Sequence, residues 1–350
     1  MSKNTKGSYT LKSNNVQAEQ LFVTGYSRSG TTMMGRILGR NSAVFTFHEI
    51  HFFEQLYFPG KEVVDFKMDD AVALLCKLLS IERQGYLQER NPTLFIDEAS
   101  AALSAAQINL HPVDVFRFFL SYESKKNGKQ ISCDQTPRNA LFMEEILNLY
   151  PRAYIVAMIR DPRDVLLSQK GKWKRRFLGA KTIPLKESIR SWINYHPVTI
   201  TKLWCASTRS ILKFKNHERV IIIKFEDLLA QPEQTVQAIC KFAGIDFASD
   251  MLNVPKVGSS LGNDKPDAKG INSDNRGNYL QGLSKSEIVI CERSSTSLRQ
   301  LLNYPDSKIS ANPVIIAFQY LIMPIKLAVA LLVNLGRTKN LLATIKRRLS

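Results

Sequence analysis

Short apolar runs alternate with longer helical stretches along the chain. Four runs rich in apolar and β-branched residues have the length of buried strands: residues 21–24, 129–133, 154–159 and 219–224. Helical stretches follow them, from residue 31 to about residue 39 and from Pro137, Pro162 and Pro232. Proline suits a first helical turn because the N–H group that it lacks would have no partner there. Strands that alternate with helices predict an α/β fold of three layers, with a central parallel sheet between two layers of helices.

The segments between these elements differ in character. Residues 60–128 and 184–215 have mainly helical patterns. Residues 254–282 are rich in Gly, Asn, Asp and Ser and predict a long loop, which in a compact domain is usually functional or disordered. Residues 1–19 are polar and predict a flexible N-terminal tail. We therefore expect one large domain over residues 20–305 and a separate C-terminal tail over residues 312–350.

The C-terminal tail is apolar first and basic afterwards. Residues 313–335 are almost wholly apolar, but Gln319, Pro324 and Lys326 interrupt them near the middle. A span of about 20 residues does not usually carry a central lysine and proline. Three interpretations stay open: a helix packed on the domain, a kinked helix in the membrane interface with Lys326 directed outward, and a true span. We expect peripheral membrane association, because five cations follow the apolar stretch: Arg337, Lys339, Lys346, Arg347 and Arg348.

Composition narrows the class of partner. The formal net charge of +17 favours an anionic partner, such as nucleic acid, a membrane surface or a phosphorylated ligand. No nucleic-acid recognition motif is visible, so nucleic acid is not expected. Five cysteines without a CxxC pair argue against a zinc ribbon and a disulfide scaffold, and for a reducing compartment. The polar N-terminus has no apolar segment before Leu21, so we expect no signal peptide and a cytoplasmic location, including the inner face of the membrane.

A glycine-rich loop lies between the first strand and the first helix. Its sequence is Gly25-Tyr26-Ser27-Arg28-Ser29-Gly30-Thr31-Thr32. Backbone N–H groups at such a helix start, together with the helix dipole, bind anions. The Gly-x4-Gly spacing matches a P-loop, but Thr31 stands where the P-loop lysine would be, and the cation of this loop is Arg28. The loop therefore suits a short anion better than a nucleoside triphosphate with magnesium; the alternative is an ordinary turn that caps a helix.

Two segments carry a resemblance to a known family. Arg28, Ser29, Gly30, Thr31 and Thr32 resemble the 5′-phosphosulfate-binding loop of the sulfotransferase superfamily. Residues 159–168, with Arg160 at the end of a strand and Ser168 on the following helix, resemble the family's 3′-phosphate-binding segment. An arginine and a hydroxyl suit a doubly charged phosphate. The resemblance implies a P-loop NTPase-like fold, 3′-phosphoadenosine-5′-phosphosulfate as co-substrate and no metal; the alternative for the second segment is a surface turn that caps a helix.

Further pieces match in the family's order. Phe225, which precedes Glu-Asp-Leu, resembles the aromatic residue that lines the adenine pocket. Arg276 and Gly277, which follow Asn275 in the long loop, resemble the element that closes over the 3′-phosphate. Lys172 belongs to the basic stretch of residues 170–176 and is expected to extend the same site. The rest of this stretch suits an anionic acceptor, a lipid surface or simply solvent.

Sulfuryl transfer to a hydroxyl needs a base and cations that stabilise the leaving phosphate. Glu49 is the expected base, because it follows an apolar run, residues 43–47, near the carboxyl end of a strand and on the same sheet edge as the loop. The resemblance is closer to the tyrosylprotein and glycan sulfotransferase branch, which implies a glutamate base at this position. His48 and His51 are the rival bases. Arg28 is the expected second catalytic residue.

One position departs from the family pattern. Gln135 stands where related enzymes often carry a lysine that stabilises the transition state, so the departure implies altered catalysis or a larger task for Arg28. The sequence predicts a sulfotransferase that acts on a hydroxyl of a glycan, a lipid or a small metabolite. Two rival functions stay open: a nucleotide or small-molecule kinase, which would need magnesium and the missing P-loop lysine, and a catalytically silent nucleotide-binding protein at a membrane.

Overall fold

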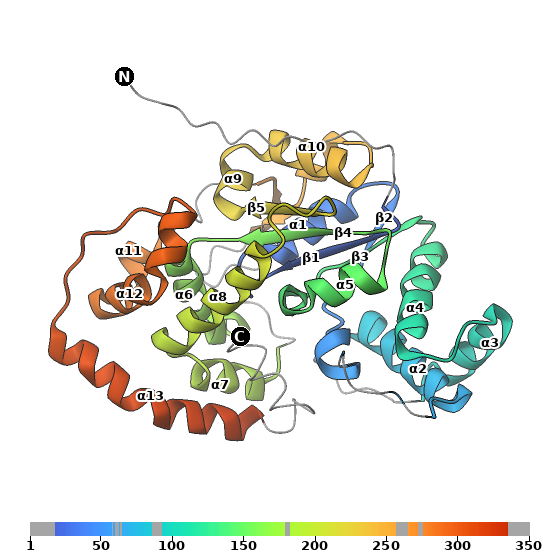
Figure 1. Cartoon of the computed structure of the whole chain (residues 1–350), viewed down its shortest axis with the longest axis horizontal. Helices are drawn as coiled ribbons and strands as arrows, with labels where there is room; N and C mark the ends of the chain where they lie inside the picture. Colours follow the sequence, from blue (N-terminus) through green and yellow to red (C-terminus); the bar gives the residue numbers. More distant parts are fainter. Residues whose placement is uncertain are drawn as a thin grey trace.

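A five-stranded parallel sheet forms the centre of the molecule. The computed structural model describes residues 18–57, 59, 63, 65–85, 93–178, 183–256, 265–271 and 276–334. The strands follow the order β2-β3-β1-β4-β5, and every neighbouring pair is parallel. Their bounds are β1 Gln20–Gly25, β2 Val44–Thr46, β3 Ile131–Asp134, β4 Ala153–Ile159 and β5 Val220–Lys224. The predicted α/β three-layer fold is confirmed (Figure 1).

Alternate side chains of the strands face the two helical layers. Leu21 and Val23 of β1 pack with the helices α1 (Thr31–Gly39), α9 (Phe225–Ala230) and α10 (Pro232–Ala243) on one face. Phe22, on the opposite side of the same strand, belongs to a second and larger apolar cluster. Helices on this second face are α2 Met68–Gln84, α4 Pro112–Lys126, α5 Met143–Leu149 and α8 Pro197–Leu212. Each strand is thus buried on both sides, as parallel sheets require.

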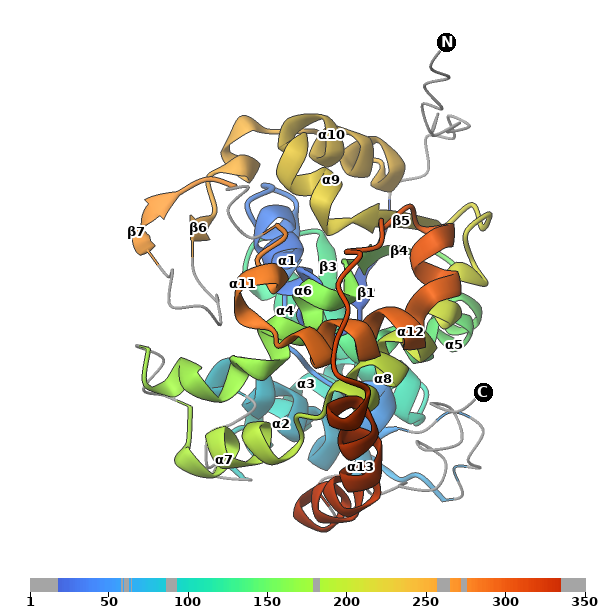
Figure 2. The ribbon, with the colours of Figure 1, turned by 90° about the vertical axis from the view of Figure 1, so that its left-hand side faces the viewer.

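The remaining elements connect or extend these layers. They are η1 Phe52–Leu56, α3 Ile96–Ala106, η2 Pro137–Leu141, α6 Pro162–Lys170, η3 Lys172–Arg176, α7 Leu185–Ile193, η4 Ser249–Leu252, β6 Pro255–Lys256, β7 Lys265–Lys269, α11 Tyr279–Gly282, α12 Lys285–Leu301 and α13 Pro313–Asn334. Helix α13 runs along the outside of the domain and packs against α7, α8 and α12 (Figures 1 and 2). Of the helices in the described residues, α13 is the one that is both long enough and apolar enough to cross a membrane.

Four sequence expectations need correction. The stretch 254–282 is not wholly loop, because β6 and β7 form an antiparallel pair and α11 follows. The helical region after β5 does not begin at Pro232, because Phe225 already starts α9. Pro137 starts only a short 3-10 turn before α5, and residues 18 and 19 are already tied to the domain by backbone hydrogen bonds. Residues 1–17 and 335–350 and Asn275 lie outside the described residues.

The strand order decides what meets at the functional edge. All five strands run in the same direction, so the segments that follow them leave the sheet at one edge. This edge therefore receives the loop after β1, the Glu49 segment after β2, the start of η2 after β3, the Arg160 segment after β4 and Phe225 after β5.

Candidate functional site

The loop between β1 and α1 has a backbone that favours anion binding. Arg28 and Gly30 both have left-handed φ angles, 78° and 93°. Gly30 caps α1, and a Cβ atom added there would lie 2.3 Å from the ring of Phe225, so the position requires glycine. The Ser29 hydroxyl is fully buried and has no hydrogen-bond partner among the described residues. The α1 N-terminus thus combines backbone N–H groups with a buried polar atom, which fits a bound phosphosulfate.

The two segments that resemble the donor-binding motifs are in direct contact. Arg28 Nε donates to Ser168 Oγ at 2.8 Å, across 140 positions of sequence. Arg160 Nη1 donates to the carbonyl oxygen of Arg28 at 3.2 Å. The guanidinium carbon of Arg160 lies 4.6 Å from the centre of the Phe225 ring. The structure therefore brings Arg28, Arg160, Ser168 and Phe225 together around one loop.

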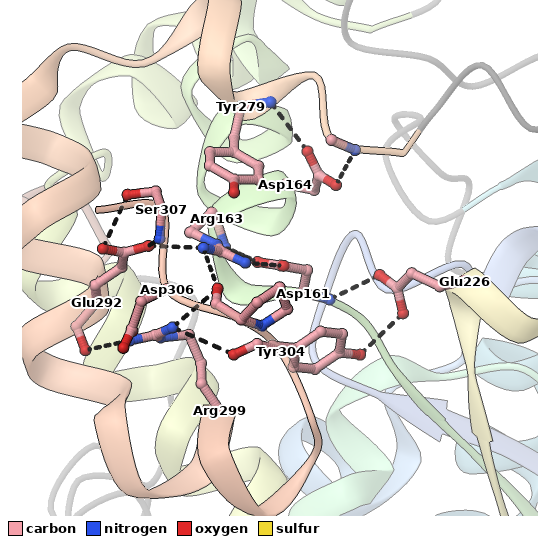
Figure 3. Close-up of polar contacts among 12 residues, drawn as sticks. Asp161, Arg163, Asp164, Glu226, Tyr279, Glu292, Arg299, Tyr304, Asp306 and Ser307 are labelled. Atoms are coloured by element: carbon pink, nitrogen blue, oxygen red, sulfur yellow. Dashed lines mark hydrogen bonds and ion pairs between the residues drawn. The ribbon is translucent and has the colours of Figure 1, made fainter. Parts of the chain in front are cut away.

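Helix α6 is fixed by a dense network of ion pairs (Figure 3). Asp161 caps the helix by accepting from the Arg163 N–H at 2.9 Å, and its other oxygen pairs with Arg163 Nη2 at 2.6 Å. Arg163 also pairs with Glu292 of α12 at 2.6 Å. The Asp161 N–H donates to Glu226 at 2.9 Å, and the Tyr304 hydroxyl donates to the same carboxylate. The capping-turn interpretation of this segment is therefore correct for Asp161 and Arg163, whereas Arg160 lies at the loop.

Arg160 sits in a buried environment with nearby carboxylates. Burial lowers the pKa of its guanidinium, while the charges of Asp164, Glu226 and Asp161 oppose that change. An arginine retains its charge under such shifts, so Arg160 stays available as a cation.

The segment with Arg276 and Gly277 is anchored on α6. The backbone N–H groups of Gly277 and Tyr279 donate to the two oxygens of Asp164, at 2.8 Å and 3.1 Å. Gly277 has a left-handed φ of 74°. The Arg276 side chain is exposed. The backbone of this element is thus held at the start of α6, beside Arg160, and Asp164 is an anchor that the sequence did not reveal.

Glu49 lies after β2, and residues at the end of β3 hold the backbone beside it. Its side chain is 41% exposed, and Glu49 Oε2 lies 3.4 Å from His51 Nε2. The N–H groups of Ile50 and His51 point at the Thr136 hydroxyl, at 3.1 Å and 3.4 Å. Thr136 in turn donates to Asp134 at 2.6 Å. The end of β3 therefore fixes the backbone that carries Glu49.

Charge couples Glu49 to the phosphate loop. Desolvation acts to raise the pKa of the Glu49 carboxyl, but the hydrogen bond from His51 and the charges of Lys172 and Arg138 outweigh it and lower the pKa. Partial burial and the charge of Arg28 lower the pKa of Lys172 to about 8, against the opposing effect of Glu49. The charges of Arg28 and Glu49 thus act on Lys172 in opposite directions. Because the pKa of Glu49 is lowered, its carboxyl group is ionised at neutral pH.

Two residues near Glu49 were missed by the sequence analysis. Arg138 lies close enough to lower the pKa of Glu49 and also pairs with Glu54 at 2.5 Å. Burial raises the pKa of Asp134 to about 6, although Thr136 and Asn139 donate to it. The available signal was the position of Asp134 at the carboxyl end of a strand, the edge where sites form in such sheets.

The rival bases separate clearly. His48 pairs with Glu82 of α2 at 3.1 Å, and this contact raises the pKa of His48. His51 is the histidine beside Glu49.

Gln135 packs against α1, where a Cβ atom added to Gly35 would lie 3.1 Å from its side chain. Within the described part of the chain no three His, Cys, Asp or Glu side chains are grouped to hold a metal ion.

A small pocket adjoins Lys172. Its volume is about 60 Å³, and six residues line it: Gln169, Lys172, Ser191, Asn194, Tyr195 and Ile200. The Gln169 side chain also donates to the carbonyl oxygen of Ser27 in the phosphate loop, at 3.3 Å. The pocket therefore connects the loop region to the α7–α8 junction.

The described residues thus place a cationic loop at a helix start and the Glu49 carboxylate at the same edge of a parallel sheet. The family model described as "Sulfotransferase family" matches residues 20–249. The chain belongs to the sulfotransferase family, and the predicted superfamily is confirmed.

Individual relatives are distant. Sulfotransferase 2A6 of Rattus norvegicus is 24% identical over 47% of this chain and 54% of its own length. Nodulation protein NoeE of Sinorhizobium fredii (strain NBRC 101917 / NGR234) is 22% identical over 65% of this chain and 50% of its own length. The chain thus spans about half the length of these curated relatives. The sulfotransferase domain of the Synechococcus PCC 7002 olefin synthase is 18% identical, covers 83% of this chain and 96% of its own, and has a TM-score of 0.49. The branch within the superfamily stays a prediction.

Proposed function

We propose that the protein transfers a sulfuryl group from 3′-phosphoadenosine-5′-phosphosulfate to a hydroxyl group of a glycan, a lipid or a small metabolite. The observation that carries this proposal is the 2.8 Å contact between Arg28 and Ser168. It joins the two segments that resemble the 5′-phosphosulfate and 3′-phosphate sites, which are 140 positions apart in sequence. Family membership supports the type of reaction, and the charges around Glu49 support the catalytic step.

The donor would lie across the loop and the start of α6. Residues 28–32 would hold the 5′-phosphosulfate through backbone N–H groups, the Ser29 hydroxyl and the Arg28 guanidinium. Arg160 and Ser168 would hold the 3′-phosphate, and the Phe225 ring would line the adenine pocket. The buried Ser29 hydroxyl supports this placement, because it lacks a partner among the described residues.

The reaction would be a displacement at sulfur. The acceptor oxygen forms a bond to sulfur while the bond between sulfur and the bridging phosphate oxygen breaks. The acceptor proton passes to the Glu49 carboxylate, and the electron pair of the broken bond stays on the bridging oxygen of adenosine 3′,5′-bisphosphate. Arg28 and Lys172 would stabilise that developing charge. Glu49 is ionised at neutral pH and can therefore accept the proton, while its lowered pKa makes it a weaker base than a free carboxylate.

Calorimetric titration of the full chain tests the donor assignment. Adenosine 3′,5′-bisphosphate should bind, ADP should bind more weakly, and ATP with magnesium should bind most weakly. Tighter binding of ATP with magnesium would instead support the kinase alternative. Transfer of labelled sulfate from the donor to a panel of glycans, lipids and small alcohols then tests turnover; donor binding without transfer to any acceptor or to water would support the silent alternative.

A further inference from the structure

Helix α13 has its polar residues turned toward the protein. The less exposed positions of the helix lie mainly on one side and include its three polar residues: Ile316, Gln319, Ile322, Met323, Lys326, Ala330, Leu331, Val333 and Asn334. The opposite face is wholly apolar and exposed: Val314 74%, Phe318 57%, Leu321 73%, Ile325 68%, Val329 41% and Leu332 67%. A surface helix of a globular protein in water instead directs polar residues outward and keeps its apolar stripe inward. The outer face of α13 is therefore not built for contact with water.

The inward polar residues hold the helix on the domain. Lys326 Nζ lies 4.7 Å from the centre of the Trp192 ring on α7. Asn334 Nδ2 donates to Asn194 Oδ1 at 2.8 Å. The expectation that Lys326 is directed outward is wrong, because this cation–π contact turns it toward the protein. These polar contacts fix α13 on the domain, so the helix can stay packed there while its outer face binds another surface.

Neighbouring segments continue the apolar surface. Helix α7 exposes Leu185, Ile189 and Trp192, by 52%, 51% and 56%, at helical spacing. Phe177 and Leu178, which follow η3, are 63% and 44% exposed. Helix α7 packs against both η3 and α13 (Figure 2). We call the exposed apolar residues of α13, α7 and this turn the α7–α13 face. Monomeric proteins in water rarely expose so many large apolar side chains together.

Charge at the edge of the face identifies the occupant. Lys174, Arg175 and Arg176 of η3 precede Phe177 directly, and five cations follow α13 in the sequence. Apolar side chains bordered by cations, with a half-exposed tryptophan, are typical of surfaces that enter the interface of anionic bilayers. A second copy of this chain would bring like charges to the same border, which opposes self-association.

We propose that the α7–α13 face docks on an anionic lipid bilayer, with α13 lying in the plane of the interface and remaining packed on the domain. This inference is independent of the donor site and goes beyond the proposed function. Twenty-two residues of helix, about 33 Å long, would enter the boundary between headgroups and acyl chains.

Vesicle flotation of the full chain tests the proposal. The protein should float with phosphatidylcholine vesicles that contain phosphatidylglycerol, and much less with phosphatidylcholine alone. Joint replacement Phe318→Gln, Leu321→Gln and Ile325→Gln should lower the bound fraction at least ~10-fold, because these side chains supply apolar burial. All three are more than half exposed, so folding should persist. The matched control is Leu94→Gln with Leu301→Gln, two leucines exposed by 53% and 60% elsewhere, which should float like the parent.

A second readout is independent of flotation. Trp192 fluorescence should shift to shorter wavelength on vesicle binding and be quenched by brominated lipids, and Trp192→Phe should remove this signal. Two results would overturn the proposal: a parent protein that stays unbound with anionic vesicles, or a triple variant that floats as well as the parent. If sedimentation equilibrium shows a dimer for the parent and a monomer for the triple variant, the face binds a second copy of the chain instead. Should the triple variant misfold by circular dichroism, Leu321→Gln alone decides.

The outcome is separable from the proposed function. Titration of the triple variant with adenosine 3′,5′-bisphosphate should match the parent, because none of its changes touches the loop or α6. Loss of vesicle binding with intact nucleotide binding strengthens the docking proposal. Intact vesicle binding in a parent chain that fails to bind the nucleotide would remove only the proposed function.

Discussion

Two clusters of charged residues lie close together in this protein and are built in opposite ways. At the α6 junction, Asp161, Arg163 and Glu292 form close ion pairs, and Glu226 accepts two hydrogen bonds (Figure 3). Around Glu49, Arg138 and Lys172 act on its carboxylate, while burial and the charges of Arg28 and Arg138 lower the pKa of Lys172 to about 8. The first arrangement stabilises the fold. The second brings cations close to one another, and a bound anion would stabilise this arrangement.

The comparison implies a division of labour. Balanced charges at the junction fix Arg160 and the start of α6, so the proposed donor would meet a preorganised site. The cations around Glu49 would be stabilised by a polyanion, so they would strengthen the binding of the proposed donor. Variants of the junction should therefore change stability, whereas variants of the residues around Glu49 should change activity or binding.

Glu49→Gln should produce the largest effect. Glutamine fills the same space but cannot accept a proton, so turnover should fall by ~10²–10⁴-fold while nucleotide binding remains. Sulfate-transfer kinetics and calorimetry measure the two quantities separately. His48→Gln, whose side chain pairs with Glu82 rather than Glu49, serves as the control and should keep most activity. If Glu49→Gln stays active while His51→Gln does not, the base is His51.

Arg163→Ala should break the other cluster. Its guanidinium is 2% exposed and pairs with Asp161 and Glu292, so its removal leaves two poorly exposed carboxylates without their main partner. We expect a loss of about 3–5 kcal/mol in the free energy of unfolding, measured by urea denaturation. Arg40→Ala removes an exposed pair with Asp250 and should cost less than about 1 kcal/mol. Equal losses for the two variants would contradict a stabilising role for the junction.

Arg160→Ala tests the residue that lies between the two clusters. A charge-assisted hydrogen bond contributes about 1.5–3 kcal/mol, so affinity for adenosine 3′,5′-bisphosphate should fall ~10- to 150-fold. Affinity for ADP, which lacks the 3′-phosphate, should change much less. Ser168→Ala should show the same selectivity with a smaller loss. Equal losses for both nucleotides would mean that Arg160 acts through its hydrogen bond to the Arg28 carbonyl and does not contact the 3′-phosphate.

Much of this architecture was predictable because its signals are local. Pro162 and Gly30 mark helix starts through their own backbone chemistry, and the bounds of α1 and α6 follow them. The expected donor-binding residues lie in contiguous motifs, so Arg28 and Arg160 could be proposed from the sequence. Whether their roles are correct is what these variants test.

The remainder depends on tertiary contacts that no local pattern encodes. Asp134 and Arg138 approach Glu49 only because β2 pairs with β3. The apolar content of α13 predicted a helix, but periodicity cannot tell which face packs on the domain, so the direction of Lys326 was wrong. The β6–β7 pair was missed because a two-residue strand has no sequence period.

The last prediction concerns the proton on Lys172. In the free protein its pKa is about 8, so its charge is present below that pH and lost above it. A bound polyanion prefers the protonated amine, so affinity for adenosine 3′,5′-bisphosphate should be constant below pH 8 and fall as the pH rises through 8. Stability has the opposite sign: the amine binds its proton more weakly in the folded than in the unfolded chain, so unfolding should become harder between pH 8 and about 10.4.

Substitutions locate the cause of this pH dependence. Lys172→Arg keeps the charge at all accessible pH values and should abolish the decline in affinity above pH 8. Glu49→Gln removes the carboxylate that raises the pKa of Lys172, so the decline should move to lower pH. Calorimetry over a pH series with all three proteins measures both shifts. A decline that persists unchanged in Lys172→Arg would belong to another group, and Lys172 would then have no place in the electrostatic chain from Arg28 to Glu49.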